Sequence, residues 1–394
     1  MGASHRVQNS SFKPIAKQRG LVMLMVVGVV VLMITLLALM LEDQHMLIRQ
    51  IGNQRIVEQS RQYSHGLNAW AMRVLHEDAN RQIDHSKEKW AKFGRPQPED
   101  EEDEDSFSLD STLARGQEDD EEDPKIDFGI DTLSVTIEDL QGRYNLNNLV
   151  EGGAKGKVNV QQKQVFLNLL QILEVGEFQE DREELYAAVV DWLDENDTSA
   201  GRGAESGDYQ IRSTPYFAGD QPLSNIGELK YVKGFSKKII SKLRPFVTVL
   251  PVHNARLNLN SVKTQVLASL AGGAVADTAP ASGFLARKEQ PGFQGFQGGD
   301  IQAAYTAVNG VSPGSKGATQ NMLQVNSQFF QINTKVELGD TKVCTRTIVL
   351  RQSANPEKLT DQTITVLSRE QDTICKEEAE DSGAEESIID EDLR

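Results

Sequence analysis

The chain contains little cysteine for its length: two residues, Cys344 and Cys375, among 394. Two cysteines cannot build the multi-bridge framework of small secreted domains, nor the four-cysteine site of a structural zinc ion. Both lie near the C-terminus, well after the one long apolar run. In an oxidising compartment they predict a single disulfide between Cys344 and Cys375, and two buried free thiols are the alternative.

Positive charge is also scarce. The 41 Lys and Arg residues are outnumbered by 58 Asp and Glu residues, which gives a formal net charge of -17. Because nucleic-acid binding draws its affinity from Lys and Arg, this balance argues against nucleic acid as a partner. The lysine-rich stretch Val232–Leu243, VKGFSKKIISKL, is similar to a helix-hairpin-helix element, and we expect it to serve packing rather than DNA binding.

Catalytic patterns are absent from the sequence. It has no G-x-S-x-G, no P-loop and no H-E-x-x-H pattern, and of its six histidines only His253 lies in the later half of the chain. A single histidine without a recognisable nucleophile or acidic partner is best explained as an ordinary surface or core residue. The sequence therefore predicts a protein that is not an enzyme.

One long hydrophobic run is present, from Leu21 to Leu41, and it contains no charged residue. As a helix it would span roughly 30 Å, which is enough to cross the hydrocarbon core of a bilayer. Basic residues up to Arg19 precede the run, and Glu42 and Asp43 follow it directly. The positive-inside rule then predicts a single-pass protein with a cytoplasmic N-terminus and the remaining chain on the other side of the membrane.

The junction before this run decides what kind of segment it is. A cleaved secretory signal would have a shorter apolar run and a small-x-small site, and a plain uncleaved anchor is a second alternative. Here a basic leader, residues 1–20, ends in Gly20, and the apolar run starts at Leu21. This arrangement resembles the class III signal of type IV pilins and pseudopilins. The resemblance implies that a prepilin peptidase cuts between Gly20 and Leu21 and methylates the new N-terminus.

The chain after the run begins with helical and then acidic segments. Residues 42–95 carry apolar residues at helical spacing, which predicts a continuation of the membrane helix. Residues 96–128 contain two runs of consecutive acids, and such runs predict a disordered, solvated loop. An acidic tail, 376–394, ends the chain.

The remaining segments predict an α+β fold. Alternating apolar residues predict antiparallel, pilin-like strands in 129–143 and 324–370. Residues 144–323 lie between them and predict an inserted α-helical domain, of which the Gly-, Ala- and Gln-rich part 273–320 is expected to be mostly loop. The expected architecture is a membrane-spanning long helix followed by an antiparallel sheet that a large helical domain interrupts.

The stretch Asp191–Gln210, DWLDENDTSAGRGAESGDYQ, gathers acids where a helix is predicted to end. The helix macrodipole disfavours negative charge there, so a bound cation would explain the pattern. Counting from Asp194, Glu205 falls at position 12 of an EF-hand loop, but Ser199 stands where that loop requires glycine. We therefore predict a calcium loop of another type. A solvated acidic surface is the alternative, and zinc is disfavoured because no His or Cys is near.

Several motifs together resemble one family. They are the leader ending at Gly20, QGRYNLNNL at 141–149, VVDWLDENDTSAGRGAE at 189–205, TPYFAGDQPLSNIGELKYVKG at 214–234, RLNLNSV at 256–262 and NSQFFQI at 326–332. The combination is similar to the type II secretion minor pseudopilins of the general secretion pathway protein K family. The resemblance covers most of the chain apart from the acidic loop 96–128 and the tails.

The resemblance implies a pilin-like fold with an inserted α-domain that binds calcium, with Asp194, Asp197 and Glu205 as main ligand candidates and Asp208 and Asp191 as weaker ones. It implies a place at the tip of a periplasmic pseudopilus, with the I and J minor pseudopilins as partners. The implied location is the bacterial inner membrane, with the bulk of the chain in the periplasm. The implied role is export of folded proteins across the outer membrane, and secreted proteins are possible further partners.

Met25 is the fifth residue after the expected cut at Gly20. In ordinary pilins a glutamate at this position pairs with a neighbour's N-terminal amine, because an unpaired charge in hydrocarbon is costly. Met25 offers no carboxylate, so we predict that it assigns this subunit to the tip. One alternative is a minor pilin of a type IV pilus or competence system, which predicts glutamate there. Another is a membrane-anchored, calcium-dependent periplasmic binding protein.

Overall fold

The computed structural model describes residues 19–78, 82–93, 132–152, 157–272, 277–310, 321–339, 341–353 and 362–372. The leader up to residue 18, the acidic loop 96–128 and the acidic tail 376–394 lie outside the described residues, so the expectations for them stay predictions. The chain divides into two compact units, Met1–Gln59 and Ser60–Arg394.

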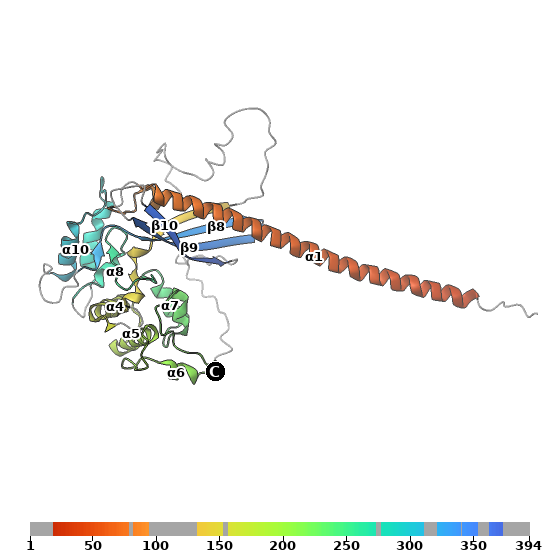
Figure 1. Cartoon of the computed structure of the whole chain (residues 1–394), viewed down its shortest axis with the longest axis horizontal. Helices are drawn as coiled ribbons and strands as arrows, with labels where there is room; N and C mark the ends of the chain where they lie inside the picture. The colour runs from red at the N-terminus through yellow and green to blue at the C-terminus, as the bar shows by residue number, and fades with distance from the viewer. Residues whose placement is uncertain are drawn as a thin grey trace, which may run out of the picture. The chain divides into compact units, whose positions relative to one another are not determined.

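Helix α1 runs without a break from Arg19 to His76, over 58 residues (Figure 1). Within it, Val22–Met40 has a mean hydropathy of 3.1 and is 0% buried. The core helix of a soluble protein would hide such a surface from water, so length and composition suit a membrane span. Met25 is 63% exposed on this segment. The backbone of Gly20 and Leu21 lies in the first turn of α1.

The long helix ends earlier than the sequence predicted. Residues 42–95 were expected to be helical, but α1 ends at His76 and a separate short helix, α2, spans Lys89–Lys92. No Gly or Pro explains the break. Tertiary contacts do: Asp84 is fully buried and accepts a hydrogen bond from Ser327 N, and Trp90 packs edge-on against Phe330 at 5.1 Å. These contacts outweigh the helical propensity of the intervening residues.

Four antiparallel strands form the main sheet in the order β1-β8-β9-β10. They are β1 (Thr132–Asp139), β8 (Phe329–Leu338), β9 (Thr341–Ser353) and β10 (Gln362–Asp372). The alternation that predicted β1 is confirmed, because Val135 and Ile137 are fully buried. The strand ends before the predicted residue 143, since the chain turns into a 3-10 helix after Asp139.

The second part of α1 packs on this sheet. Its buried residues recur at helical spacing and form one stripe: Ser60, Ser64, Leu67, Asn68, Ala71 and Leu75. Ser64 Oγ lies 2.7 Å from Thr334 Oγ1 in β8 and donates to Thr345 Oγ1 in β9 at 2.8 Å. A small polar residue at this point allows the helix to bond to both central strands.

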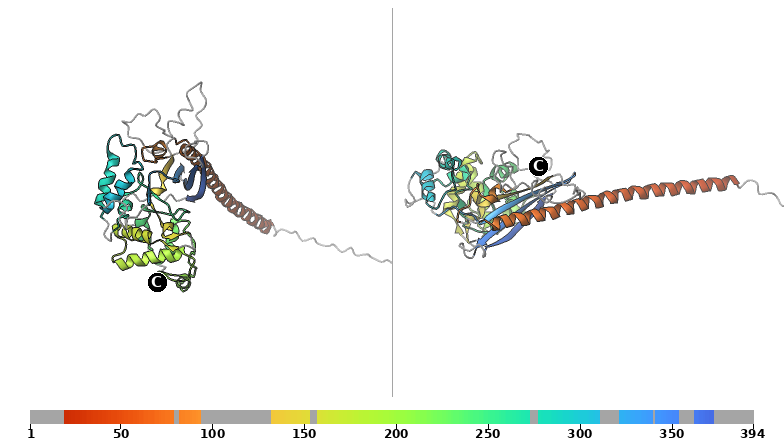
Figure 2. Two further views of the ribbon diagram at one scale, coloured as in Figure 1. Left: turned by 60° about the vertical axis from the view of Figure 1, so that its left-hand side comes forward. Right: turned by 90° about the horizontal axis from the view of Figure 1, so that it is seen from above.

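The chain between β1 and β8 forms the inserted helical domain, as predicted. Figure 2 shows its helices gathered beside the sheet. They are α4 (Val160–Ile172), α5 (Gln179–Leu193), α6 (Ser206–Gln210), α7 (Lys237–Leu243), α8 (Thr264–Ala268), α9 (Ala279–Leu285) and α10 (Asp300–Asn309). Residues 273–320 were expected to be mostly loop, and for the described part, 277–310, this is wrong because α9 and α10 lie there. Fully buried Phe296 packs against Phe284 and Phe293, and this aromatic cluster holds the Gly-rich segment in place.

Short elements connect these helices. The two-residue strands pair in three ladders: β2 (Tyr144–Asn145) with β5 (Val247–Thr248), β3 (Val150–Glu151) with β4 (Lys157–Val158), and β6 (Leu257–Asn258) with β7 (Leu323–Gln324). The 3-10 helices are η1 (Leu140–Gly142), η2 (Leu146–Leu149), η3 (Ile226–Tyr231) and η4 (Ala286–Glu289). Gln324, predicted to begin the main sheet, therefore belongs to β7, and the sheet resumes at Phe329.

The asparagines of the QGRYNLNNL and RLNLNSV motifs are structural. Buried Asn147 accepts a hydrogen bond from Leu223 N and donates to Leu223 O and Leu250 O, each at 2.9 Å. In the second motif Asn258 Nδ2 lies 3.0 Å from Asp84 O and 2.8 Å from Asp139 Oδ2. The motifs thus join the inserted domain to itself, to the segment between α1 and α2, and to the end of β1.

Candidate functional site: the acidic loop after helix α5

The predicted metal-ligating acids lie on one loop that runs from α5 to α6. Helix α5 is buried on all sides from Leu185 to Leu193, and it ends with Asp194 as its C-cap residue. Helix α6 begins after Glu205, which is its N-cap residue. Asp194 and Glu205 therefore stand at the two ends of the loop.

Asp191 holds the loop in its folded form. It is fully buried, and its carboxylate accepts hydrogen bonds from Ser199 Oγ at 2.9 Å and from Ala200 N at 2.8 Å. The loop then passes directly over the same carboxylate at Gly203, where a Cβ atom would lie 1.9 Å from Asp191 Oδ2. Since these contacts use its oxygens, Asp191 acts first as an organiser of the loop.

Asp194 and Glu205 are buried, and in the part of the chain that the structure describes three of their four carboxylate oxygens lack a hydrogen-bond partner. They are 6% and 8% exposed, and Asp194 Oδ1 and both carboxylate oxygens of Glu205 have no hydrogen-bond partner among the described residues. Burying a carboxylate without a donor or a cation costs free energy. A proton or a hard cation that prefers oxygen ligands would remove this cost, and calcium is such a cation. The donor set therefore fits the predicted metal.

The pKa values of these groups reflect the same environment. Burial, and then the negative charge of Asp191, raises the pKa of Asp194 to about 6. Burial, and then the charges of Asp191 and Asp194, raises the pKa of Glu205 to about 7. Below these values the two carboxyl groups therefore hold protons unless a cation replaces them.

The remaining predicted ligands differ in their placement. Asp208 is exposed, and its Oδ2 accepts a hydrogen bond from Glu205 N at 3.0 Å, which caps α6. Asp197 is exposed, and its negative charge contributes to the raised pKa of Glu205. The structure thus brings Asp191, Asp194, Asp197 and Glu205 into one electrostatic group, with Asp208 occupied at its edge.

Asp220 belongs to this group, although no sequence pattern predicted it. Its negative charge raises the pKa of both Asp194 and Glu205, and its own pKa is raised by burial and then by Asp197. It follows Gly219, whose Cβ would lie 2.6 Å from Trp192 Nε1. This close approach, which only glycine allows, brings Asp220 to the loop from another segment.

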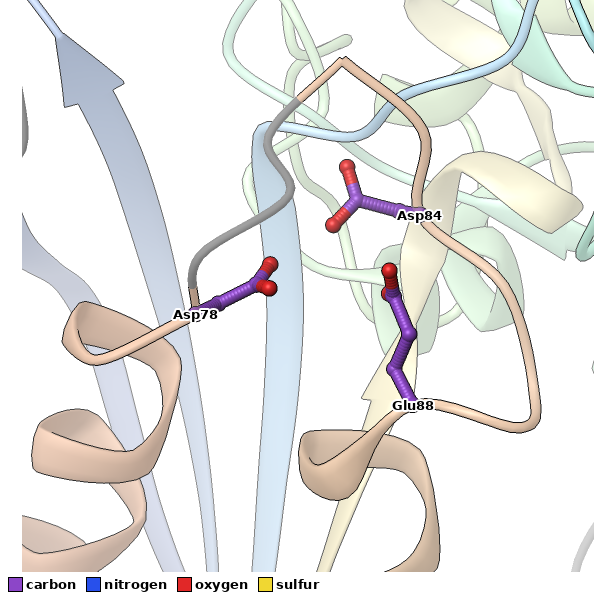
Figure 3. A group of neighbouring side chains, drawn as sticks. All are labelled: Asp78, Asp84 and Glu88. Atoms are coloured by element: carbon purple, nitrogen blue, oxygen red, sulfur yellow. The ribbon is translucent and has the colours of Figure 1, made fainter. Parts of the chain in front are cut away.

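A second group of acids, which was not predicted, lies between α1 and α2. Asp78, Asp84 and Glu88 offer carboxylate oxygens within 4.8 Å of one another, and their side chains point toward one another (Figure 3). Arg351 of β9 provides the positive charge: its Nη1 lies 2.8 Å from Asp78 Oδ2, and its Nη2 contacts Asp84 Oδ1. Glu88 Oε2 accepts a hydrogen bond from Trp90 Nε1 at 2.6 Å.

This second group joins the end of α1 to the sheet. Burial raises the pKa of Asp84 to about 7 against the opposing effect of Arg351, and burial and then Asp78 raise the pKa of Glu88 to about 8. Each carboxylate already has a protein partner. These partners explain why the three carboxylates can be buried together, and the group does not require a metal ion.

His253, the lysine-rich stretch Val232–Leu243 and Cys344 make contacts that serve packing. His253 is half-buried, and its Nδ1 lies 3.3 Å from Asn147 O. The lysine-rich hairpin packs on α5 and the acidic loop: Lys233 Nζ lies 3.2 Å from Glu184 Oε1 and donates to Arg202 O at 3.0 Å. Cys344 in β9 is disulfide-bonded. Cys375 lies outside the described residues, so its pairing with Cys344 stays a prediction.

Residues 142–252, which include the acidic loop between α5 and α6, match the family model described as type II secretion system (T2SS), protein K. Type II secretion system protein K of Pseudomonas aeruginosa is 29% identical over 82% of this chain and 86% of its own length. The protein of the same name from Pectobacterium carotovorum is 25% identical over 85% of this chain and 93% of its own length.

The fold has a counterpart among solved structures. A chain in the crystal structure of the GspK-GspI-GspJ complex of the enterotoxigenic Escherichia coli type 2 secretion system aligns with a TM-score of 0.60 and 20% identity. The alignment covers 82% of this chain and 99% of that chain. The expected α+β architecture of long helix, antiparallel sheet and inserted helical domain is confirmed.

Proposed function

Since the chain belongs to the type II secretion system protein K family, we propose that it works at the tip of a periplasmic pseudopilus. It is a minor pseudopilin, and its proposed partners are the I and J minor pseudopilins. The observation that carries the proposal is α1, a single helix that starts in a fully exposed apolar segment and ends against an antiparallel sheet. The role is structural rather than enzymatic, and it supports export of folded proteins across the outer membrane.

The proposed maturation follows from the position of Gly20. A prepilin peptidase cuts after Gly20 and methylates Leu21, and the apolar helix then remains in the inner membrane with the rest of the chain in the periplasm. Sequencing the N-terminus of the protein recovered from membranes tests this step. Methyl-Leu21 is the expected first residue. An intact leader would favour the alternative of a membrane-anchored periplasmic binding protein.

The proposed place at the tip rests on Met25. Replacing it by glutamate supplies the carboxylate that could pair with a neighbour's amine, so the Met25→Glu variant should be found along the filament shaft as well as at its end. Met25→Gln is the control, because it is polar but cannot ionise. If immunogold labelling finds Met25→Glu at filament ends only, as for the unmodified protein, Met25 does not determine the position.

We also propose that the acidic loop binds calcium through Asp194, Glu205 and Asp220, with Asp197 adding charge. The unpartnered buried oxygens of Asp194 and Glu205 support this assignment. Calorimetric titration of the chelator-treated full chain with Ca²⁺ tests it, and the Asp194→Asn/Glu205→Gln variant should lose the binding. Glu180→Gln, on the exposed start of α5, is the matched control. Equal titration of both variants would refute the site.

A further inference from the structure

A small pocket lies between the sheet and the inserted domain. The sheet contributes Arg346 and Ile348 of β9 and Glu370 of β10, and the insertion contributes Arg143, Asn225 and Arg244. The cavity has a volume of about 50 Å³. This is enough for several water-sized groups, and it is too small for a nucleotide or a sugar. Leu140, Val247 and Ile348 give the pocket an apolar part of its lining.

Three guanidinium groups line this pocket in a chain whose net charge is -17. Two of them have carboxylate partners: Arg143 Nη2 lies 2.8 Å from Glu138 Oε2, and Arg346 Nη1 lies 3.6 Å from Glu370 Oε2. The side chain of Arg244 has neither an ion pair nor a hydrogen bond in the part of the chain that the structure describes. A half-buried guanidinium with five free donors needs an acceptor, which water supplies less well than an anion.

We propose that this pocket binds a carboxylate, with Arg244 as its main ligand and Arg143 and Arg346 beside it. The volume suits a group with two oxygens, and the planar fork of arginine matches a carboxylate in bidentate geometry. Glu370 already places one negative charge in the pocket, which disfavours a doubly charged phosphate. The apolar floor accommodates the carbon atoms that carry the carboxylate.

The carboxylate can come from two sources, an acidic side chain of a neighbouring protein or a free small carboxylate. The pocket opens to solvent between the sheet and the inserted domain, so a partner's Asp or Glu can reach it. Identifying that partner as the I or J minor pseudopilin rests on the proposed function. The binding of a carboxylate does not.

Acetate is the probe for the pocket itself. The full chain in detergent is unfolded by heat in sodium acetate and in sodium chloride at equal pH and ionic strength. Acetate should raise the Tm by about 2 °C in the unmodified chain, because a ligand of the folded state stabilises it. The Arg244→Gln variant should lose this difference. Lys242→Gln removes the same charge from an exposed site on α7 and should keep it.

The second arm measures binding of the full chain to the I and J components. If a partner's side chain fills the pocket, Arg244→Gln should weaken that binding at least about tenfold, because it leaves a desolvated carboxylate unpaired. Arg244→Lys, which keeps the charge but loses the fork, should have an intermediate effect. Lys242→Gln should bind as the unmodified chain does.

The outcomes separate the possibilities. An acetate response without an effect on partner binding supports the pocket and assigns it to a free carboxylate, whereas loss of partner binding in Arg244→Gln assigns it to a side chain. If Arg244→Gln behaves as Lys242→Gln does in both arms, the proposal is overturned. If the unmodified chain fails to bind I and J, the proposed function fails, and the acetate arm still decides whether the pocket binds a carboxylate.

Discussion

Arg351 Nη1 lies 2.8 Å from Oδ2 of Asp78, which comes just after the last turn of α1, although 273 residues separate the two in the chain. Both side chains are almost inaccessible, at 5% and 9% exposure. Arg351 also contacts Asp84 and lies over the ring of Phe330 at 4.6 Å. One side chain of β9 thus fixes the point at which the long helix ends.

Replacing Arg351 by methionine should destabilise the head by about 3–5 kcal/mol, because it leaves two buried carboxylates without their counter-charge. Denaturant unfolding of the full chain, followed by tryptophan fluorescence, measures the change. Lys342→Met is the control, since this lysine is 54% exposed in its ion pair with Glu337 and should cost less than about 1 kcal/mol. Similar losses of stability in the two variants would show that the buried ion pairs of Arg351 stabilise the fold no more than an exposed ion pair does.

Glu88→Gln should reduce the loss of stability at high pH. Burial raises the pKa of Glu88 to about 8 and that of Asp84 to about 7, above the ordinary values of 4.5 and 3.8. The folded state therefore retains protons that the unfolded state releases, and the free energy of unfolding falls as pH rises from about 4 to about 8.

A pH series of denaturant unfolding measures this slope. Glu88→Gln keeps an acceptor for Trp90 Nε1 but cannot ionise, so its curve should fall less steeply. The exposed Glu77→Gln variant should follow the unmodified chain. Superimposable curves for all three proteins would contradict the assignment of a raised pKa to Glu88.

The contrast between the two acidic groups shows what the sequence could reveal. Asp194 and Glu205 share one short loop, so their spacing was enough to predict a cation site. Asp78 and Asp84 acquire their role only through Arg351, which no local pattern connects to them. The same reason explains the wrong helix end, since the contacts of Asp84 lie outside any helical window.

The sheet and the insertion were predictable because their signals are local. Alternating residues predicted β1, and α4 begins at a purely local signal, since Asn159 accepts hydrogen bonds from Gln161 N and Gln162 N. Asp220 was not predictable, since it reaches the acidic loop only through the packing of Gly219 on Trp192. The helices α9 and α10 were not predicted because their segment is rich in glycine, and the burial of Phe296 that stabilises it depends on tertiary contacts.

The calcium affinity of the acidic loop should rise with pH. Asp194 and Glu205 have pKa values raised to about 6 and about 7, and calcium must displace the protons that they hold below those values. The apparent affinity should increase by up to about tenfold per pH unit for each proton displaced. Titrations at several pH values between about 5.5 and 7.5 measure this change. An affinity that is constant over this range would show that neither group is a ligand.

Gly203→Ala should destabilise the acidic loop by about 1–3 kcal/mol, because its Cβ would overlap with Asp191 Oδ2 and force the loop away. Thermal unfolding and calcium titration of the same variant should both show the effect. Gly207→Ala is the control, since nothing lies within 4 Å of a Cβ at that position. Unchanged calcium binding in Gly203→Ala would show that the close approach at Gly203 is not needed to place the calcium ligands.

Asn147→Ala should cost about 3 kcal/mol or more, because it leaves buried polar groups of Leu223 and Leu250 without a partner. Denaturant unfolding measures the loss. Asn53→Ala, at an exposed position on α1, should change stability little. If the two variants were equally stable, the buried asparagines would not hold the inserted domain together.

The position of the insertion within the sheet has a consequence for the order of folding. Ser327 Oγ and Asp139 Oδ2 lie 2.6 Å apart, yet 188 residues separate them in the chain. Closing so long a loop of flexible chain costs roughly 5 kcal/mol in entropy, and a compact insertion lowers that cost by bringing its own ends together. We therefore expect the inserted domain to fold before β1 pairs with β8.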